Sequence, residues 1–201
     1  MPLLSLLVLL TVGQTPTPPP PGGHPFDGVA QVLMHPRCMN CHPAGDRPLQ
    51  KDTQIFHKQN VSRRIEQLGH ACTTCHPAKM LPGAGLPPGA PHWRMPSART
   101  PMVFEKRTPQ QLCEQLKAPE TNGNRTLEQL RTHLAEDAIV KEGFSPGEGR
   151  SVPPLSHEQF IQRVDAWLAA GAPCPSPSSS PSPSPSPSSS PSPSPAAPQR
   201  K

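Results

Sequence analysis

Cys38-Met39-Asn40-Cys41-His42 recurs in pattern as Cys72-Thr73-Thr74-Cys75-His76, and both stretches continue into Pro-Ala. The shared pattern is C-x-x-C-H, which is the covalent attachment signature of c-type haem. Two thiols three residues apart on a helical turn reach the two vinyl groups of one porphyrin, and the adjoining histidine points its imidazole at the iron. The sequence therefore predicts two covalent c-type haems, held by Cys38 and Cys41 and by Cys72 and Cys75, with His42 and His76 as proximal iron ligands.

Two C-x-x-C pairs are also found in four-cysteine zinc sites, which are the main alternative. The 30 residues between Cys41 and Cys72 exceed the usual spacing of about 15–20. A zinc site also gives no reason for a histidine after both pairs. A thioredoxin-like redox dithiol needs one such pair in a βαβ context, which the sequence lacks. We therefore expect haem at both motifs.

The composition agrees with a core that is not made of side chains alone. The chain has 33 prolines, and its aromatic residues are five Phe and two Trp, with no Tyr. Two porphyrins would supply the large apolar bodies that the scarce aromatic rings do not. The formal net charge of +5 includes Arg200 and Lys201 at the C-terminus, and no basic stripe alternates with aromatic residues. Nucleic acid is therefore not an expected partner.

The chain divides into four segments. Residues 1–13 form an apolar run that is shorter than the ~20 residues of a membrane span. We interpret them as a signal peptide, with a buried N-terminal strand as the alternative, and expect no membrane span after cleavage. A Pro-rich spacer at 14–24, a dihaem cytochrome domain at 25–174 and a disordered Ser/Pro-rich tail at 175–201 follow. The protein is then exported, to the periplasm of a bacterium.

The expected fold is mainly α, with short helices and long Pro-rich loops packed around two covalently attached haems, as in multihaem c-type cytochromes. Capping boxes begin helices after Thr108, Thr126 and Ser156. The second of these helices is expected to carry Leu127, Leu130, Leu134 and Ala138 on one face. A helix capped by Asp27 and another at 61–68, ended by Gly69, complete the set. No alternating pattern indicates strands.

The other cysteines, Cys113 and Cys174, are expected to form a disulfide, because an exported protein rarely leaves two thiols free. The sixth ligand of each iron is more open. His35 is too near its own motif to fold back easily onto the same iron but could serve the other haem. His57 lies between the motifs and could reach either haem. The wider set of histidines and methionines favours bis-histidine ligation of at least one haem. Candidates to pair with the haem propionates are Lys58, Arg63 and Arg64.

The core resembles a family of small exported dihaem cytochromes labelled as the cytochrome c subunit of isoquinoline 1-oxidoreductase, a molybdenum hydroxylase. The resemblance rests on residues 35–43, 72–76, 88–93, 112–117, 122–125, the helix with His133, and 171–175, and it covers most of 28–175. It implies an electron carrier for an exported oxidoreductase. It also favours four distal-ligand candidates, namely His35, His57, His133 and Met102.

The sequence therefore predicts a periplasmic dihaem cytochrome c that transfers electrons and is not itself an enzyme. Its expected partners are an exported dehydrogenase or oxidoreductase and a downstream electron acceptor. The alternative is a haem enzyme, or a gas or redox sensor, with one open position on an iron. An enzyme of that kind needs a distal acid–base pair, and the sequence offers none beyond its generic His and Arg residues.

Overall fold

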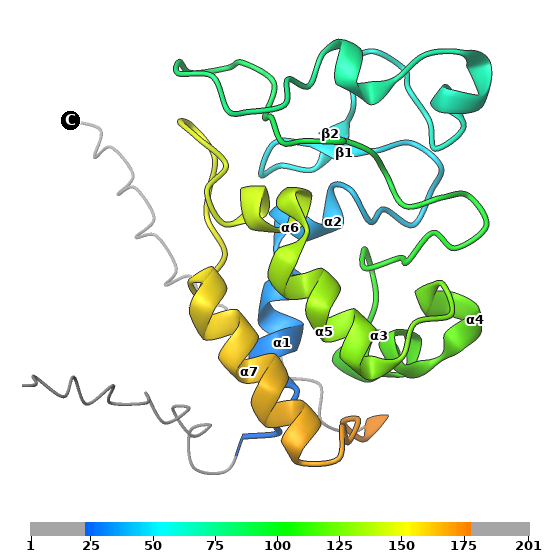
Figure 1. The fold of residues 1–201 in the computed structure, drawn as a ribbon, viewed down its shortest axis with the longest axis vertical. Helices are drawn as coiled ribbons and strands as arrows, with labels where there is room; N and C mark the ends of the chain where they lie inside the picture. The colour runs from blue at the N-terminus through cyan, green and yellow to red at the C-terminus, as the bar shows by residue number, and fades with distance from the viewer. Residues whose placement is uncertain (1–22, 178–201) are drawn as a thin grey trace, which may run out of the picture.

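The structure is a computed structural model that describes residues 23–177. The predicted signal peptide at 1–13, most of the spacer at 14–24 and most of the tail at 175–201 lie outside the described residues. Within 23–177, no helix is both long enough and apolar enough to cross a membrane. The chain is mainly helical, as predicted, and consists of a helical part and a loop part (Figure 1).

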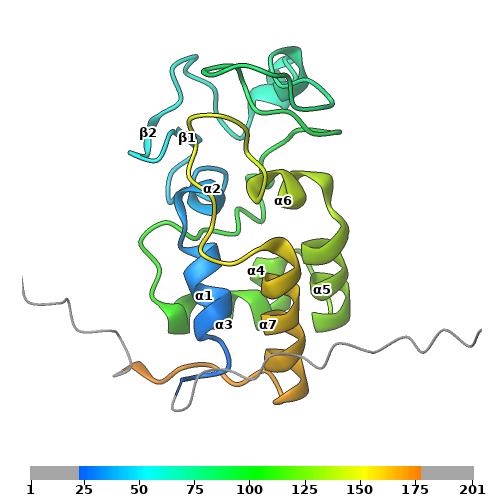
Figure 2. The ribbon, with the colours of Figure 1, turned by 90° about the vertical axis from the view of Figure 1, so that its left-hand side faces the viewer.

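The helical part is built from α1 (Asp27–Leu33), α3 (Pro109–Lys117), α5 (Leu127–Glu136) and α7 (His157–Ala169). Helix α7 packs against both α1 and α5, and α3 packs against α1 and α5 (Figures 1 and 2). Each helix buries one apolar stripe in a shared core, as amphipathic helices do. The largest fully buried side chains of this core are Phe26, Val29, Val32, Leu112, Leu116, Phe160, Val164 and Trp167.

The capping boxes were predicted correctly. The side chains of Thr108, Thr126 and Ser156 each accept a hydrogen bond from the backbone N–H of the Gln three residues on. The side-chain oxygen of that Gln accepts in turn from the backbone N–H of the cap residue. The expected face running to Ala138 is wrong, because α5 ends at Glu136. The Asp137 side chain accepts from the backbone of the next turn and begins a separate helix, α6 (Ala138–Gly143). A short α4 (Pro119–Asn122) precedes α5.

The predicted disulfide is present and fastens the end of the described chain to α3. Cys113 and Cys174 are bonded, with their Cα atoms 5.5 Å apart. Two hydrogen bonds support the same strap: Trp167 Nε1 donates to the Pro173 carbonyl at 2.8 Å, and Lys117 Nζ donates to the Ala172 carbonyl at 2.7 Å. The last segment therefore closes over the core at both α7 and α3.

Two short predicted elements differ from the structure. Asp27 is the first residue of α1 and not its cap, and its carboxylate accepts from the His24 N–H at 2.8 Å. The helix expected at 61–68 is reduced to the 3-10 turn η1 (Ile65–Leu68), although Gly69 follows it with a positive φ of 81°. Arg63 N–H donates to the Asp46 carbonyl instead of to a helical partner, so a tertiary contact replaces the first helical turn.

The loop part runs from residue 44 to 100 and has almost no side-chain core. It contains β1 (Leu49–Gln50) and β2 (Ile55–Phe56), an antiparallel pair too short to leave an alternating pattern, and the 3-10 turn η2 (Cys72–Thr74). Leu49 is the only large hydrophobic side chain buried among its described side chains. Several others are exposed, namely Ile55, Phe56, Leu68, Leu81 and Leu86. An apolar body other than side chains would complete this part.

Candidate functional site

The first C-x-x-C-H motif lies on one tight turn at the top of the helical part. Helix α2 (Pro36–Met39) begins after His35, with proline at its first position, and the chain continues as a helical turn through His42. The His42 N–H donates to the carbonyls of Cys38 at 3.1 Å and Met39 at 3.2 Å. Cys38, Cys41 and His42 thus lie together on one helical turn, as covalent haem attachment requires.

The second motif repeats this turn in the loop part. It starts on η2, and the His76 N–H donates to the Cys72 carbonyl at 3.0 Å while the Cys75 N–H donates to the same carbonyl at 3.2 Å. Only three residues of 3-10 helix surround it, so the motif itself and not a longer helix determines the local shape. The duplication seen in the sequence is therefore also a duplication of local structure.

Both motif histidines are oriented by a backbone carbonyl. His42 Nδ1 lies 2.6 Å from the Met102 carbonyl oxygen, and His76 Nδ1 lies 2.8 Å from the Pro88 carbonyl oxygen. A carbonyl only accepts, so Nδ1 carries the proton in each ring and donates it. This leaves Nε2 as the unprotonated nitrogen that can bind a metal, and such an outer hydrogen bond is typical of metal-ligating histidine.

An aromatic ring stacks on each of these histidines. His42 and Phe104 have ring centroids 3.9 Å apart with planes 10° from parallel, and His76 and Trp93 have centroids 4.4 Å apart with planes 3° from parallel. The Phe104 N–H also donates to the His42 carbonyl at 2.8 Å. Each imidazole is therefore fixed by one hydrogen bond and one stacked ring, both from a segment later in the chain.

Burial sets the protonation of both motif histidines and of the first motif's cysteines. It lowers the pKa of His42 to about 4 and also lowers the pKa of His76, so both rings are neutral at pH 7. Burial raises the pKa of the Cys38 thiol to about 12 and that of Cys41 to about 11, so both are protonated thiols at pH 7 when nothing is bound to them. A neutral imidazole is the form of histidine that binds a metal.

The four motif cysteines do not converge on a single point. Among residues 23–177, no group of three or more His, Cys, Asp or Glu side chains is placed to hold a metal ion. The arrangement thus gives a four-cysteine zinc site no support. A haem iron needs fewer protein ligands than a zinc ion, because the porphyrin supplies four ligands and the chain only one or two. The Cys72 thiol adds to the raised pKa of Cys41, which places the two motifs near each other.

Buried polar atoms without partners gather around the motifs. Within the described chain, six of these atoms belong to residues between 37 and 57, and the seventh is Glu142 Oε1. They include the Nε atoms of Arg37 and Arg47, which sequence reasoning missed as cations beside the site. Haem propionates are acceptors that such guanidinium groups bind well. Their signal in the sequence was position, since Arg37 directly precedes the first motif and Arg47 follows it closely.

The cations proposed from the sequence for this role have other surroundings. The Arg63 guanidinium donates to the carbonyls of Pro43 at 2.9 Å, Pro96 at 3.1 Å and Pro101 at 3.2 Å. It therefore joins the end of the first motif to the loop that leads to Met102 and Phe104. Lys58 and Arg64 are exposed.

The structure separates the distal-ligand candidates into two kinds. His35 accepts from the Arg37 N–H at Nδ1, and its Nε2 lies 3.3 Å from the Ser151 hydroxyl, so both ring nitrogens already have partners. The Met102 carbonyl accepts from His42 Nδ1, so the Met102 backbone lies on the side of the His42 ring away from Nε2.

The two remaining candidates each lie near a motif histidine. The His57 and His76 rings have centroids 6.2 Å apart. His133 contributes to the lowered pKa of His42, and its own Nδ1 lies 3.6 Å from Asp137 Oδ2, which leaves Nε2 available. A carboxylate at Nδ1 is a common support for a ligating histidine. The structure thus associates His57 with the second motif and His133 with the first.

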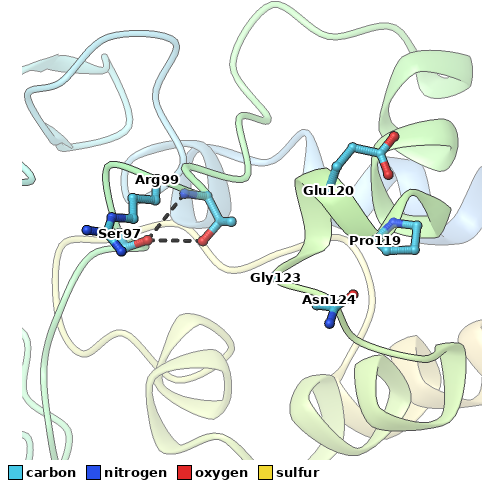
Figure 3. Close-up of a pocket in the computed structure, with 7 residues that line it drawn as sticks. Ser97, Arg99, Pro119, Glu120, Gly123 and Asn124 are labelled. Carbon is cyan, nitrogen blue, oxygen red and sulfur yellow. Dashed lines mark hydrogen bonds between the residues drawn. The ribbon is translucent and has the colours of Figure 1, made fainter.

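A surface pocket elsewhere has no motif residue in its lining. It lies between Ser97–Thr100 and Pro119–Asn124, and Ser97 and Thr100 are hydrogen-bonded within it (Figure 3). Its lining includes one arginine, Arg99, and one acidic residue, Glu120, which stand on opposite sides. We assign it no part in the site.

No protein-family model, curated protein or solved structure matches this chain. The site consists of two C-x-x-C-H turns, two oriented neutral imidazoles and two half-buried arginines, Arg37 and Arg47.

Proposed function

We propose that the protein is an exported, periplasmic dihaem c-type cytochrome that relays single electrons. In this role it accepts electrons from an exported oxidoreductase, of the molybdenum hydroxylase kind, and passes them to a downstream acceptor. The observation that carries the proposal is the repeated arrangement of His42 and His76, each with Nδ1 donating to a carbonyl and one face against an aromatic ring. Two such histidines, each next to a C-x-x-C pair, fit two c-type haems.

The residues of this chain divide the work of holding the cofactor. Cys38 and Cys41 would hold one haem and Cys72 and Cys75 the other, while His42 and His76 would each offer Nε2 to an iron. When bound, a c-type haem supplies a one-electron couple whose potential depends on axial ligands and burial. The carbonyl at Nδ1 increases the basicity of each imidazole and fixes its ring plane. Rings held in place in this way need little reorganisation when the iron charge changes.

The missing core of the loop part also supports two haems. Phe56 is 62% exposed and Leu68 is 70% exposed in a segment whose only large buried hydrophobic side chain, among those described, is Leu49. Apolar groups left in water at this density are unusual in a packed segment. A porphyrin attached at Cys72 and Cys75 gives this segment an apolar surface to pack against.

The test is to produce the protein by export alongside the haem-attachment machinery and to measure its intact mass and its oxidised and reduced spectra. We expect two covalent haems with low-spin bands in both states. A Cys72→Ala/Cys75→Ala variant should keep one covalent haem, and so should Cys38→Ala/Cys41→Ala. The matched control Cys113→Ala/Cys174→Ala should keep two.

The outcomes separate the alternatives. A high-spin component, or a spectral change on adding carbon monoxide, would show an open iron position and favour a haem enzyme or sensor. A colourless protein that contains zinc would contradict the assignment of both motifs.

A further inference from the structure

We propose that His57 is the second axial ligand of the iron held by His76, so that the second haem has bis-histidine ligation. This inference rests on the proposed function and adds to it the ligand that determines the spin state and potential of one haem. It is carried by the placement of the His57 ring, by its partnerless nitrogen and by the way its backbone is anchored.

The first observation is the distance between the two rings. Their centroids lie 6.2 Å apart, and the ring planes are tilted by 45°. Two imidazoles that bind one metal from opposite sides, each with a bond of about 2 Å, have centroids roughly 6 Å apart. The separation matches the one expected for two imidazoles bound to a single metal ion.

The second observation concerns the His57 side chain itself. Its Nδ1 is buried and has no hydrogen-bond partner within residues 23–177. A buried ring nitrogen without a partner loses free energy relative to water, so such atoms in folded proteins usually have a function or a missing partner. Nδ1 of a histidine that binds metal through Nε2 normally donates, and a water molecule would provide the acceptor here.

The third observation is that the backbone of His57 is fixed. The residue follows β2 directly, its N–H donates to the Pro48 carbonyl at 3.0 Å, and its carbonyl accepts from Arg47 Nη2 at 3.1 Å. Arg47 also lies over the Phe56 ring, 4.9 Å from its centroid. The short β1–β2 pair, which follows the first motif in the chain, therefore places the His57 imidazole beside His76 of the second motif.

The other candidate histidines have different surroundings. His70 and His92 are exposed, and the His92 carbonyl accepts from Arg94. His35 uses both ring nitrogens, and His133 lies beside Asp137 and near His42. Among the described histidines, His57 is therefore the one whose ring lies beside His76 and has a buried nitrogen without a hydrogen-bond partner.

The experiment compares the holoprotein with His57→Ala and with the matched control His70→Ala, which removes an exposed imidazole from the same loop part. Intact mass, electron paramagnetic resonance of the oxidised protein and carbon monoxide binding to the reduced protein are measured on all three. We expect two covalent haems in each protein. In His57→Ala, one iron of the two should become high-spin and bind carbon monoxide, and added imidazole should restore the low-spin signal. The control should behave as the wild type.

Two results would overturn the assignment. One is a His57→Ala protein with two covalent haems, both low-spin and unreactive to carbon monoxide. The other uses the wild type alone and so does not depend on the variant folding: near-infrared magnetic circular dichroism that finds no bis-imidazole haem. A wild-type protein without covalent haem would overturn the proposed function and this inference with it, and the mass spectrum separates that case from a wrongly assigned ligand.

Discussion

Removing the disulfide between Cys113 and Cys174 tests how the helical part is stabilised. The bond closes a loop with a sequence separation of 61 residues. In the chain-entropy treatment, a loop of this length restricts the unfolded chain by about 4 kcal/mol at 25 °C. Both C-x-x-C-H motifs lie outside the loop, so covalent haem would not constrain it in the unfolded state, and the full effect is expected.

The assay is urea unfolding of the holoprotein, comparing the wild type with Cys113→Ala/Cys174→Ala. With an m-value of about 2 kcal/mol per M, the loss of about 4 kcal/mol moves the midpoint down by about 2 M. The wild type in excess reductant is the control, because thioether bonds to haem survive the reagent and only the disulfide opens. A loss below about 1 kcal/mol in both samples would refute the entropic reasoning and show that the loop is already restricted in the unfolded chain.

Two further changes test the site and its surroundings. A Cβ added at Gly89 would lie 2.5 Å from the Lys79 carbonyl oxygen, so Gly89→Ala should displace the neighbouring Pro88 carbonyl from His76 and shift the reduction potential of one haem. Gly45 has open space around it, so the control Gly45→Ala should leave both reduction potentials unchanged. Equal potentials in the two variants would contradict this reasoning. Burial raises the pKa of Glu142 to about 7, so the unfolded chain releases its proton from about pH 4.5 upward while the folded chain holds it, and stability falls as pH rises through that window. At pH 8, Glu142→Gln should therefore be more stable to urea than the wild type by about 3 kcal/mol, and at pH 4.5 the two should be about equally stable. A stability difference that is the same at both pH values would point to a cause other than this carboxyl.

Local rules predicted the parts of this protein that depend on neighbours in sequence. Capping boxes at Thr108, Thr126 and Ser156 begin helices because a side chain and a backbone N–H three residues apart can satisfy each other without any help from the rest of the fold. The same local reasoning failed at 61–64. There the Arg63 N–H and guanidinium bind carbonyls far away in sequence, and these bonds outweigh one turn of helix.

The candidate site was predicted in the same divided way. Cys38, Cys41, His42 and their counterparts in the second motif are adjacent in sequence, so spacing alone identifies them. The Met102 and Pro88 carbonyls that orient the two histidines have no side-chain signature, because every residue has a carbonyl. Phe104 and Trp93 are visible in the sequence as rare aromatic rings, but nothing local indicates which histidine each one meets.

The sequence by itself determined that there are two C-x-x-C-H motifs, which cysteines remain for a disulfide, and where the capped helices begin. Only the tertiary structure decided which distant groups lie at each motif histidine: the His57 ring and the Pro88 carbonyl at His76, and the Met102 carbonyl and His133 at His42. The physical reason is that the first set depends on atoms a few bonds apart along the chain. The second set depends on how long Pro-rich loops cross, and such loops have no periodic pattern from which their neighbours could be inferred.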